Sequence, residues 1–207
     1  RTPVNNLMGM TEIALSKEKH PNEYQQLLEQ CMHEYQQLSI LIESLLFLAR
    51  ADHGQLTLKK QAIHVLEEIL NICDYYQAVA DENKITFICL GNANVSVDVT
   101  LFQRIISNLI SNALKYTPPN GAITINIALA DQWVKISIDD TGFGISDEHI
   151  ARIFDRFYRI DPSRSSQLGG LGLGLAIVKS IVDLHQGSVN ITSKPGIGTS
   201  IHLQLPV

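Results

Sequence analysis

A tract rich in glycine and leucine near the C-terminal end of the chain has the composition of a phosphate-binding loop. Gly170, Gly172 and Gly174 alternate with Leu171 and Leu173, directly before an apolar run typical of a helix. Glycine lets backbone amides approach a phosphate closely, and a helix start adds positive potential. The tract is neither a P-loop nor a dinucleotide fingerprint. It predicts a nucleotide site of another fold, with a merely flexible connection as the alternative.

Four polar or aromatic side chains share one face of a helix predicted over residues 100–116. Asn108, Asn112, Lys115 and Tyr116 occupy positions i, i+4, i+7 and i+8, beside an apolar stripe. An amide oxygen suits Mg2+, an ammonium group suits phosphate oxygens, and an aromatic ring can lie against a base. The face is therefore suited to a metal nucleotide. If the helix is taken alone, two surface or capping asparagines are the simpler interpretation.

An acidic residue stands on the apolar side of a predicted strand. The alternation of a strand places Asp140 on the same side as Ile136 and Ile138, just before the turn that Gly142 begins. A buried carboxylate needs a hydrogen-bond donor, and an adenine amino group would serve. Asp139, on the opposite face, is expected to be solvated.

Composition restricts the classes of protein to which these residues can belong. The chain has 207 residues, of which 45% are hydrophobic and 18% are charged, enough for an average domain and a smaller one. A net charge of -5 argues against a nucleic-acid partner, since such proteins are usually basic. Cys31, Cys73 and Cys89 form no metal-binding motif, and we expect reduced core residues. No stretch has the apolar length of a membrane span or the pattern of a signal peptide.

The first quarter of the chain has the pattern of a helical hairpin. Apolar residues recur at helical spacing on both sides of a break near Pro21. The second helix carries a heptad seam that runs from Tyr24 to Ala49 and is too wide for one partner helix to cover. We therefore expect a homodimer through residues 1–52, arranged as a four-helix bundle. The alternative is packing of this seam onto the C-terminal domain.

A linker over residues 53–59 leads to a mixed pattern over residues 60–207. Helices are expected over residues 65–82, 100–116 and 173–185. Strands are expected over residues 86–90, 95–97, 123–129, 134–138, 188–192 and 199–205. Helices on one side of a mixed sheet form a two-layer α/β sandwich, so the predicted fold class of the whole chain is α+β.

Four ordered motifs resemble the N, G1, F and G2 boxes of sensor histidine kinases. They are Asn108–Ala113, Asp140–Gly144, Phe154–Arg159 and Gly170–Leu175. The resemblance covers essentially the whole chain. It implies that the hairpin is a dimerisation and histidine-phosphotransfer domain and that residues 60–207 are a catalytic ATP-binding domain.

Two further stretches extend the resemblance. Arg1-Thr2-Pro3 looks like the tail of the family's His-Glu-Leu-Arg-Thr-Pro phosphoacceptor box. The phrases Leu46–Asp52 and Phe157–Arg164 look most like the branch that senses copper, silver and other heavy metals. The phosphoacceptor histidine would then lie just before Arg1, and we expect residues 1–207 alone not to phosphorylate themselves. His33 is a poor substitute, because the residues after it depart from the box.

The resemblance also implies roles for the polar residues of the nucleotide site. Asn112 would coordinate Mg2+ with Asn108 in support. Lys115 and Arg159 would hold phosphate oxygens of ATP, and Tyr116 would border the base.

The remaining implied roles fall on turns and loops. Asp140 would accept a hydrogen bond from the adenine amino group, and Gly142 and Gly144 would leave room for the ring. Residues 161–168 fit a mobile lid, and residues 170–174 fit its hinge and a phosphate cradle.

The implied reaction passes the ATP γ-phosphate to a histidine and then to an aspartate on the receiver domain of a response regulator. Thr2 matches the position that helps water attack the phosphorylated regulator. The family implies the cytoplasmic domain of a bacterial inner-membrane protein, joined to the membrane only through upstream segments. Two alternatives stay open: a nucleotide-binding dimerisation module with phosphatase output only, or a related ATPase of the gyrase, chaperone or mismatch-repair type. Those ATPases have a glutamate where Asn108 stands, as general base.

Overall fold

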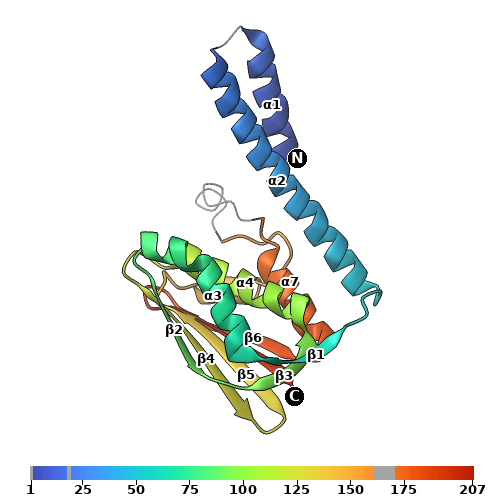
Figure 1. The fold of residues 1–207 in the computed structure, drawn as a ribbon, viewed down its shortest axis with the longest axis vertical. Helices are drawn as coiled ribbons and strands as arrows, with labels where there is room; N and C mark the ends of the chain where they lie inside the picture. Colours follow the sequence, from blue (N-terminus) through green and yellow to red (C-terminus); the bar gives the residue numbers. More distant parts are fainter. Residues whose placement is uncertain (1, 18–19, 161–170) are drawn as a thin grey trace. The chain divides into compact units, whose positions relative to one another are not determined.

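The computed structural model describes residues 2–17, 20–160 and 171–207 (Figure 1). The chain forms two compact units, Arg1–Asp52 and His53–Val207. No helix among the described residues is long and apolar enough to cross a membrane.

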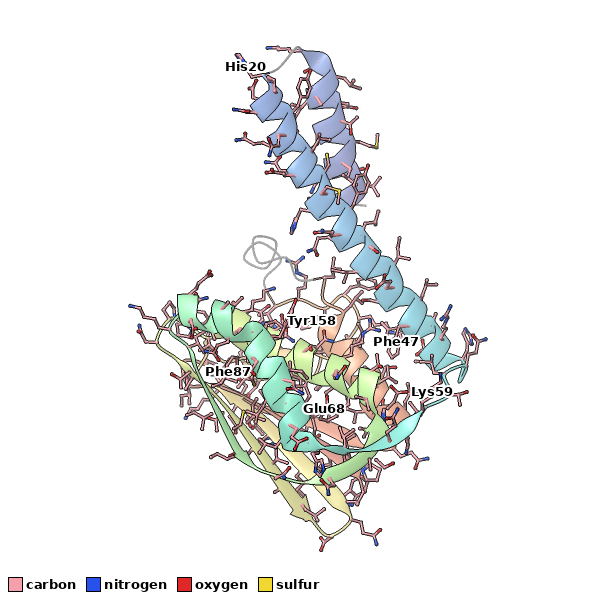
Figure 2. All side chains as sticks on the ribbon, in the orientation of Figure 1. His20, Phe47, Lys59, Glu68, Phe87 and Tyr158 are labelled. Carbon is pink, nitrogen blue, oxygen red and sulfur yellow. The ribbon has the colours of Figure 1, made fainter. Side chains whose placement is uncertain are left out.

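The first unit is an antiparallel pair of helices, α1 (Thr2–Ser16) and α2 (Pro21–Asp52). The start of α2 is capped, because the backbone N–H of His20, labelled in Figure 2, donates to Glu23 Oε2 at 2.9 Å. Between the helices, Asn6 Nδ2 donates to Glu34 Oε1 at 3.0 Å. This is the helical hairpin that the sequence predicts.

The hairpin leaves much of its apolar surface uncovered. Part of the predicted seam of α2, including Tyr24, Cys31 and Leu38, is half-buried. The rest remains exposed, although these side chains are large and apolar. The exposed large apolar side chains on the two helices are Val4, Met8, Ile13, Leu15, Leu28, Met32, Tyr35, Ile40, Ile42, Leu45 and Leu46. So many exposed large apolar side chains on two helices favour an interaction surface.

The second unit is built on a five-stranded mixed sheet with the order β2-β4-β5-β7-β6. The β2–β4 pair is parallel and the other pairs are antiparallel. A separate antiparallel pair joins β1 to β3. The strands are β1 (Lys60–His64), β2 (Thr86–Gly91), β3 (Asn94–Asp98), β4 (Ala122–Ala130), β5 (Trp133–Asp140), β6 (Ser188–Lys194) and β7 (Gly198–Pro206).

Three helices cover one face of this sheet: α3 (Val65–Glu82), α4 (Val99–Tyr116) and α7 (Gly174–Leu184) (Figure 1). Apolar side chains of the helices and of the inner sheet face form the core, and Phe102, Ile106, Ile125 and Ile181 are almost fully buried. The predicted two-layer sandwich is therefore confirmed.

Two short elements were not expected from the sequence. Strand β1 buries only Ile63, so it shows no alternation. Helix α5 (Asp147–Ile150) is a single turn, too short for a periodic pattern. The start of α4 is one residue earlier than expected, because Asp98 Oδ1 accepts from the backbone N–H of Leu101 at 3.2 Å and caps the helix.

The expectation that all three cysteines are core residues is only partly correct. All three are free thiols, and only Cys73 is buried; Cys31 and Cys89 are half-buried. Cys73 and Cys89, far apart in sequence, lie on α3 and β2, two elements that pack against each other.

Candidate functional site

The carboxylate of Asp140 lies at the inner end of β5, where the sequence predicts it. Its Oδ1 accepts hydrogen bonds from the backbone N–H groups of Gly142 at 2.8 Å and Thr199 at 3.2 Å. Its Oδ2 accepts none from any residue that the structure describes. Burial raises the pKa of Asp140, the two N–H groups oppose that shift, and neighbouring Asp139 adds to it. One oxygen of a half-buried acid is therefore available to a donor from a ligand.

Asp139 faces the other side of the sheet and is more enclosed than the expected solvated neighbour. Its Oδ2 accepts from Asn126 Nδ2 and from Ser137 Oγ, both at 2.9 Å, and its Oδ1 accepts from Ser200 Oγ. The two consecutive acids thus have different environments. The carboxylate of Asp139 accepts hydrogen bonds from side chains at both oxygens, whereas Asp140 accepts them from backbone N–H groups at one oxygen only.

The turn after Asp140 is held against the end of α4. The backbone N–H of Phe143 donates to the carbonyl of Tyr116 at 3.2 Å. A Cβ at Gly142 would lie 2.6 Å from both Asp140 Oδ1 and the Tyr116 carbonyl oxygen, and Gly144 has a φ of +70°. Both glycines are therefore required by the close approach of backbone to backbone. Their predicted role in leaving room for the base stays a prediction.

The two asparagines of α4 lie against the start of α7. Asn108 Nδ2 donates to the carbonyl of Arg104 at 2.7 Å. A Cβ at Gly174 would lie 2.9 Å from Asn108 Oδ1 and 4.0 Å from Asn112 Nδ2. The half-buried amide of Asn112 has no hydrogen-bond partner among the described residues. The structure thus brings the amide-bearing face of α4 to the glycine-rich helix start.

Two cations and an aromatic ring gather at the C-terminal end of α4. Burial lowers the pKa of Lys115, and the nearby charge of Arg159 lowers it further. Lys115 Nζ lies 5.2 Å from the centroid of the Tyr116 ring. Burial raises the pKa of Tyr116, and Arg159 opposes this shift. Arg159 therefore lies close enough to both residues to act on them, as the predicted site requires.

A backbone hydrogen bond joins the segment around Phe157 to the glycine-rich tract. The N–H of Phe157 donates to the carbonyl of Gly172 at 2.8 Å. Gly172 has a φ of +69°, and a Cβ there would lie 2.9 Å from the Tyr158 carbonyl oxygen. Leu173 is buried, and Leu171 is half-buried. The position of Arg159 is thereby linked to the start of α7.

The structure also shows contacts around Tyr158, the residue before Arg159, that sequence reasoning missed. Tyr158, labelled on the helical side of the unit in Figure 2, has its hydroxyl 2.7 Å from His149 Nδ1. The Arg152 guanidinium lies 4.4 Å from the centroid of the same ring. These three residues come from segments without helical or strand periodicity, so no pattern pointed to them.

Some predicted residues lie outside what the structure describes. They are Gly170, the predicted lid over residues 161–168, and the side chain of Thr2. Their roles stay predictions.

Comparison with known protein families matches two stretches of the chain, one in each unit. Residues 1–54 match the "His Kinase A (phospho-acceptor) domain". Residues 97–207 match the "Histidine kinase-, DNA gyrase B-, and HSP90-like ATPase" family. The chain belongs to the sensor histidine kinases.

Curated relatives agree with that assignment. "Sensor protein IrlS" of Burkholderia pseudomallei (strain K96243) is 41% identical over all of this chain and 44% of the relative. "Sensor histidine kinase CusS" of Escherichia coli O157:H7 is 39% identical over all of this chain and 43% of the relative. The chain thus spans less than half the length of these relatives. The resemblances to sensor histidine kinases and to their heavy-metal branch are confirmed.

Solved structures show the same fold. Acinetobacter baumannii histidine kinase AdeS has a TM-score of 0.81 at 22% identity, covering all of this chain and 95% of the other. Full-length ShkA in complex with AMPPNP has a TM-score of 0.78 at 23% identity, covering all of this chain and 43% of the other. ThkA in complex with response regulator protein TrrA has a TM-score of 0.77 at 20% identity, covering all of this chain and 58% of the other.

Proposed function

We propose that the second unit binds ATP with Mg2+ and that the intact protein transfers the γ-phosphate to a histidine and then to a response-regulator aspartate. The observation that carries the proposal is the carboxylate of Asp140. Its Oδ1 is fixed by two backbone N–H groups, while its Oδ2 accepts from no described residue. Such an oxygen, in a half-buried position, favours a ligand with an N–H donor, and the 6-amino group of adenine is one.

The amides of Asn108 and Asn112 on α4 form a second part of the site, and they are suited to Mg2+. Asn112 has an amide without a partner among the described residues, and an amide oxygen is a hard ligand. No group of three or more His, Cys, Asp or Glu side chains in the described part of the chain could form a cage of its own. That pattern suits Mg2+, which is commonly held by few protein ligands together with phosphate oxygens and waters. The Asn108 amide, which donates to the Arg104 carbonyl, would be a fixed polar group beside Asn112 on the same face of α4.

The neighbouring cations supply affinity for phosphate. Arg159 lies close enough to Lys115 for its charge to lower the pKa of Lys115, and a polyanion between the two cations would relieve that repulsion. The start of α7 at Gly174 adds the positive potential of a helix N-terminus. When bound, ATP supplies the phosphoryl group and Mg2+ offsets its charge. Lys115, Arg159 and the α7 start would hold the phosphate oxygens in line with the attacking group.

The position of Asn108 favours transfer to a protein over hydrolysis. A neutral amide cannot take a proton from water, so Asn108 cannot act as the general base of the related ATPases. Water is therefore not activated at this position. The phosphoacceptor would be the histidine that the Arg1-Thr2-Pro3 resemblance places just before Arg1.

The partners of the whole protein are part of the same proposal. The exposed apolar side chains of α1 and α2 would be buried by a second copy, giving a homodimer through residues 1–52. The receiver domain of a response regulator would be the phosphate acceptor, as the ThkA–TrrA complex supports for that protein. We propose a cytoplasmic position below an inner-membrane sensor of metal ions.

Two measurements test the proposal separately. Calorimetry of this chain with ATP and Mg2+ should give one site per chain, and absence of binding would contradict the nucleotide assignment. The protein extended through the residues before Arg1 should take up labelled phosphate in an acid-labile, histidine-linked form. If it binds ATP but takes up no label, the kinase assignment is wrong and a binding module remains.

A further inference from the structure

The residue two positions before Arg159 has a strained backbone. Phe157 has a φ of +64°, a left-handed conformation that is rare for a bulky side chain. Its own ring does not hold this conformation by burial, because Phe157 is 54% exposed. Such strain persists only where the surrounding contacts hold it, and it gathers at functional sites. The contacts around this turn therefore bear on the position of Arg159.

Backbone hydrogen bonds hold the turn at Phe157 and on the side before it. The Phe157 N–H donates to the carbonyl of Gly172 at 2.8 Å, and the Tyr158 N–H donates to the carbonyl of Asp155 at 3.3 Å. A Cβ at Gly172 would lie 2.9 Å from the carbonyl carbon of Phe157, so the two backbones are in close contact. The side chain of Tyr158 is the next anchor along the chain toward Arg159.

The side chain of Tyr158 is held at its hydroxyl and at its ring. The hydroxyl lies 2.7 Å from His149 Nδ1, and the Arg152 guanidinium lies 4.4 Å from the ring centroid (Figure 2). On the other side of the imidazole, His149 Nε2 lies 3.5 Å from Glu148 Oε1. The carboxylate favours a proton on Nε2, which leaves Nδ1 to accept from the Tyr158 hydroxyl. One contact thus fixes the far end of the side chain and another fixes its face.

We propose that His149 and Tyr158 are positioning residues for Arg159. The imidazole fixes the Tyr158 hydroxyl, and the anchored ring keeps the strained turn at Phe157 from relaxing. The turn in turn aims the half-buried Arg159 at the phosphate groups of ATP. The inference rests on the proposed function, because phosphate is the ligand assigned there to Arg159. Neither positioning residue needs to touch the nucleotide, so their loss should affect recognition of the phosphates and not of the base.

Tyr158→Phe tests the proposal with a small change, because it removes the hydroxyl and keeps the ring that faces Arg152. In titrations with Mg2+ we expect it to weaken ATP binding by about 2- to 13-fold, the range for loss of one hydrogen bond. Binding of adenosine should not change, because adenosine has no phosphate for Arg159 to hold. His149→Leu should give the same pattern. Tyr75→Phe is the matched control: Tyr75 is 81% exposed on α3, and this variant should bind both ligands as the parent chain does.

A double variant shows whether the effect passes through Arg159. In an Arg159→Ala background, Tyr158→Phe should cause no further loss of ATP affinity, because residues that act through one another are not additive. Full additivity would overturn the proposal. Unchanged ATP affinity in Tyr158→Phe, or equal losses for ATP and adenosine, would also overturn it.

Hydrogen exchange of the ligand-free chain tests the turn without a nucleotide. Tyr158→Phe should speed exchange at the Phe157 amide, which is bonded to Gly172, while the Ile177 amide, bonded to the Leu173 carbonyl at 2.9 Å, should exchange as in the parent chain. Unchanged exchange at Phe157 would overturn the positioning role. Absence of ATP binding by the parent chain would overturn the proposed function and the aim of Arg159 at phosphate, whereas a failure confined to the variants overturns the positioning role alone.

Discussion

Replacement of Asp140 by Asn separates the fold of the site from its recognition of the base. The Asn Oδ1 can keep both hydrogen bonds that Asp140 Oδ1 accepts, from Gly142 and from Thr199. The atom in place of Oδ2 becomes an N–H donor and faces the donor of an adenine amino group. A hydrogen bond to a charged partner contributes about 1.5–3 kcal/mol. We therefore expect Asp140→Asn to weaken ATP binding by about 10- to 150-fold.

The folding stability of the Asp140→Asn variant should not fall with its ATP affinity. Because burial raises the pKa of Asp140 above its unfolded value, the folded parent gains stability as pH falls through that raised pKa. The ionised form is correspondingly disfavoured at neutral pH. Asn carries no charge, so thermal unfolding at neutral pH should show equal or greater stability, and this pH dependence should disappear. Calorimetric titration with ATP and thermal melts measure the two effects independently.

Asp139→Asn is the matched control, because it makes the same chemical change one residue away on the opposite sheet face. Its partners are Asn126, Ser137 and Ser200, and none of these residues is predicted to touch the nucleotide. It should therefore leave ATP affinity unchanged. If Asp140→Asn binds ATP as tightly as Asp139→Asn does, the assignment of Asp140 to the adenine amino group is refuted.

Further predictions concern a metal ligand, a glycine, a histidine and the hairpin. Asn112→Ala should abolish the Mg2+ dependence of ATP affinity, and a Mg2+ titration that matches the parent would remove that role. Gly142→Ala places a Cβ 2.6 Å from the Tyr116 carbonyl oxygen, so we expect a loss of about 1–3 kcal/mol in a denaturant titration, and an unchanged midpoint would contradict the contact. Burial lowers the pKa of His185, so stability should fall as pH drops below about 6.5, by about 1.4 kcal/mol per unit of depression; His185→Gln should flatten that slope. Leu28→Glu, at an exposed apolar position of α2, should shift the chain from dimer to monomer in light scattering, and a persistent dimer would place the interface elsewhere.

The sequence predicted those parts of the site that have a periodic pattern. Asn108, Asn112 and Lys115 follow from helical spacing, and the inward position of Asp140 follows from strand alternation. These elements are long and amphipathic, so their patterns are strong. The roles assigned to the same residues rest on resemblance and stay predictions.

The features that could not be predicted depend on contacts between distant segments. The contacts of Tyr158 with His149 and Arg152 join segments too short or too irregular for a periodic pattern. The packing of α3, which carries Cys73, against β2, which carries Cys89, joins segments that no local pattern pairs. His185 joins α7 to β3, because its Nδ1 donates to the Ile181 carbonyl at 2.9 Å and its Nε2 accepts from the Asp98 N–H at 3.0 Å.

The most direct test of the account is a crystal structure of this chain with a non-hydrolysable ATP analogue and Mg2+. We expect the 6-amino group of adenine within hydrogen-bond distance of Asp140 Oδ2, Mg2+ on the Asn112 amide oxygen, and phosphate oxygens between Lys115, Arg159 and the start of α7. A purine bound elsewhere, with Asp140 Oδ2 facing water, would contradict it.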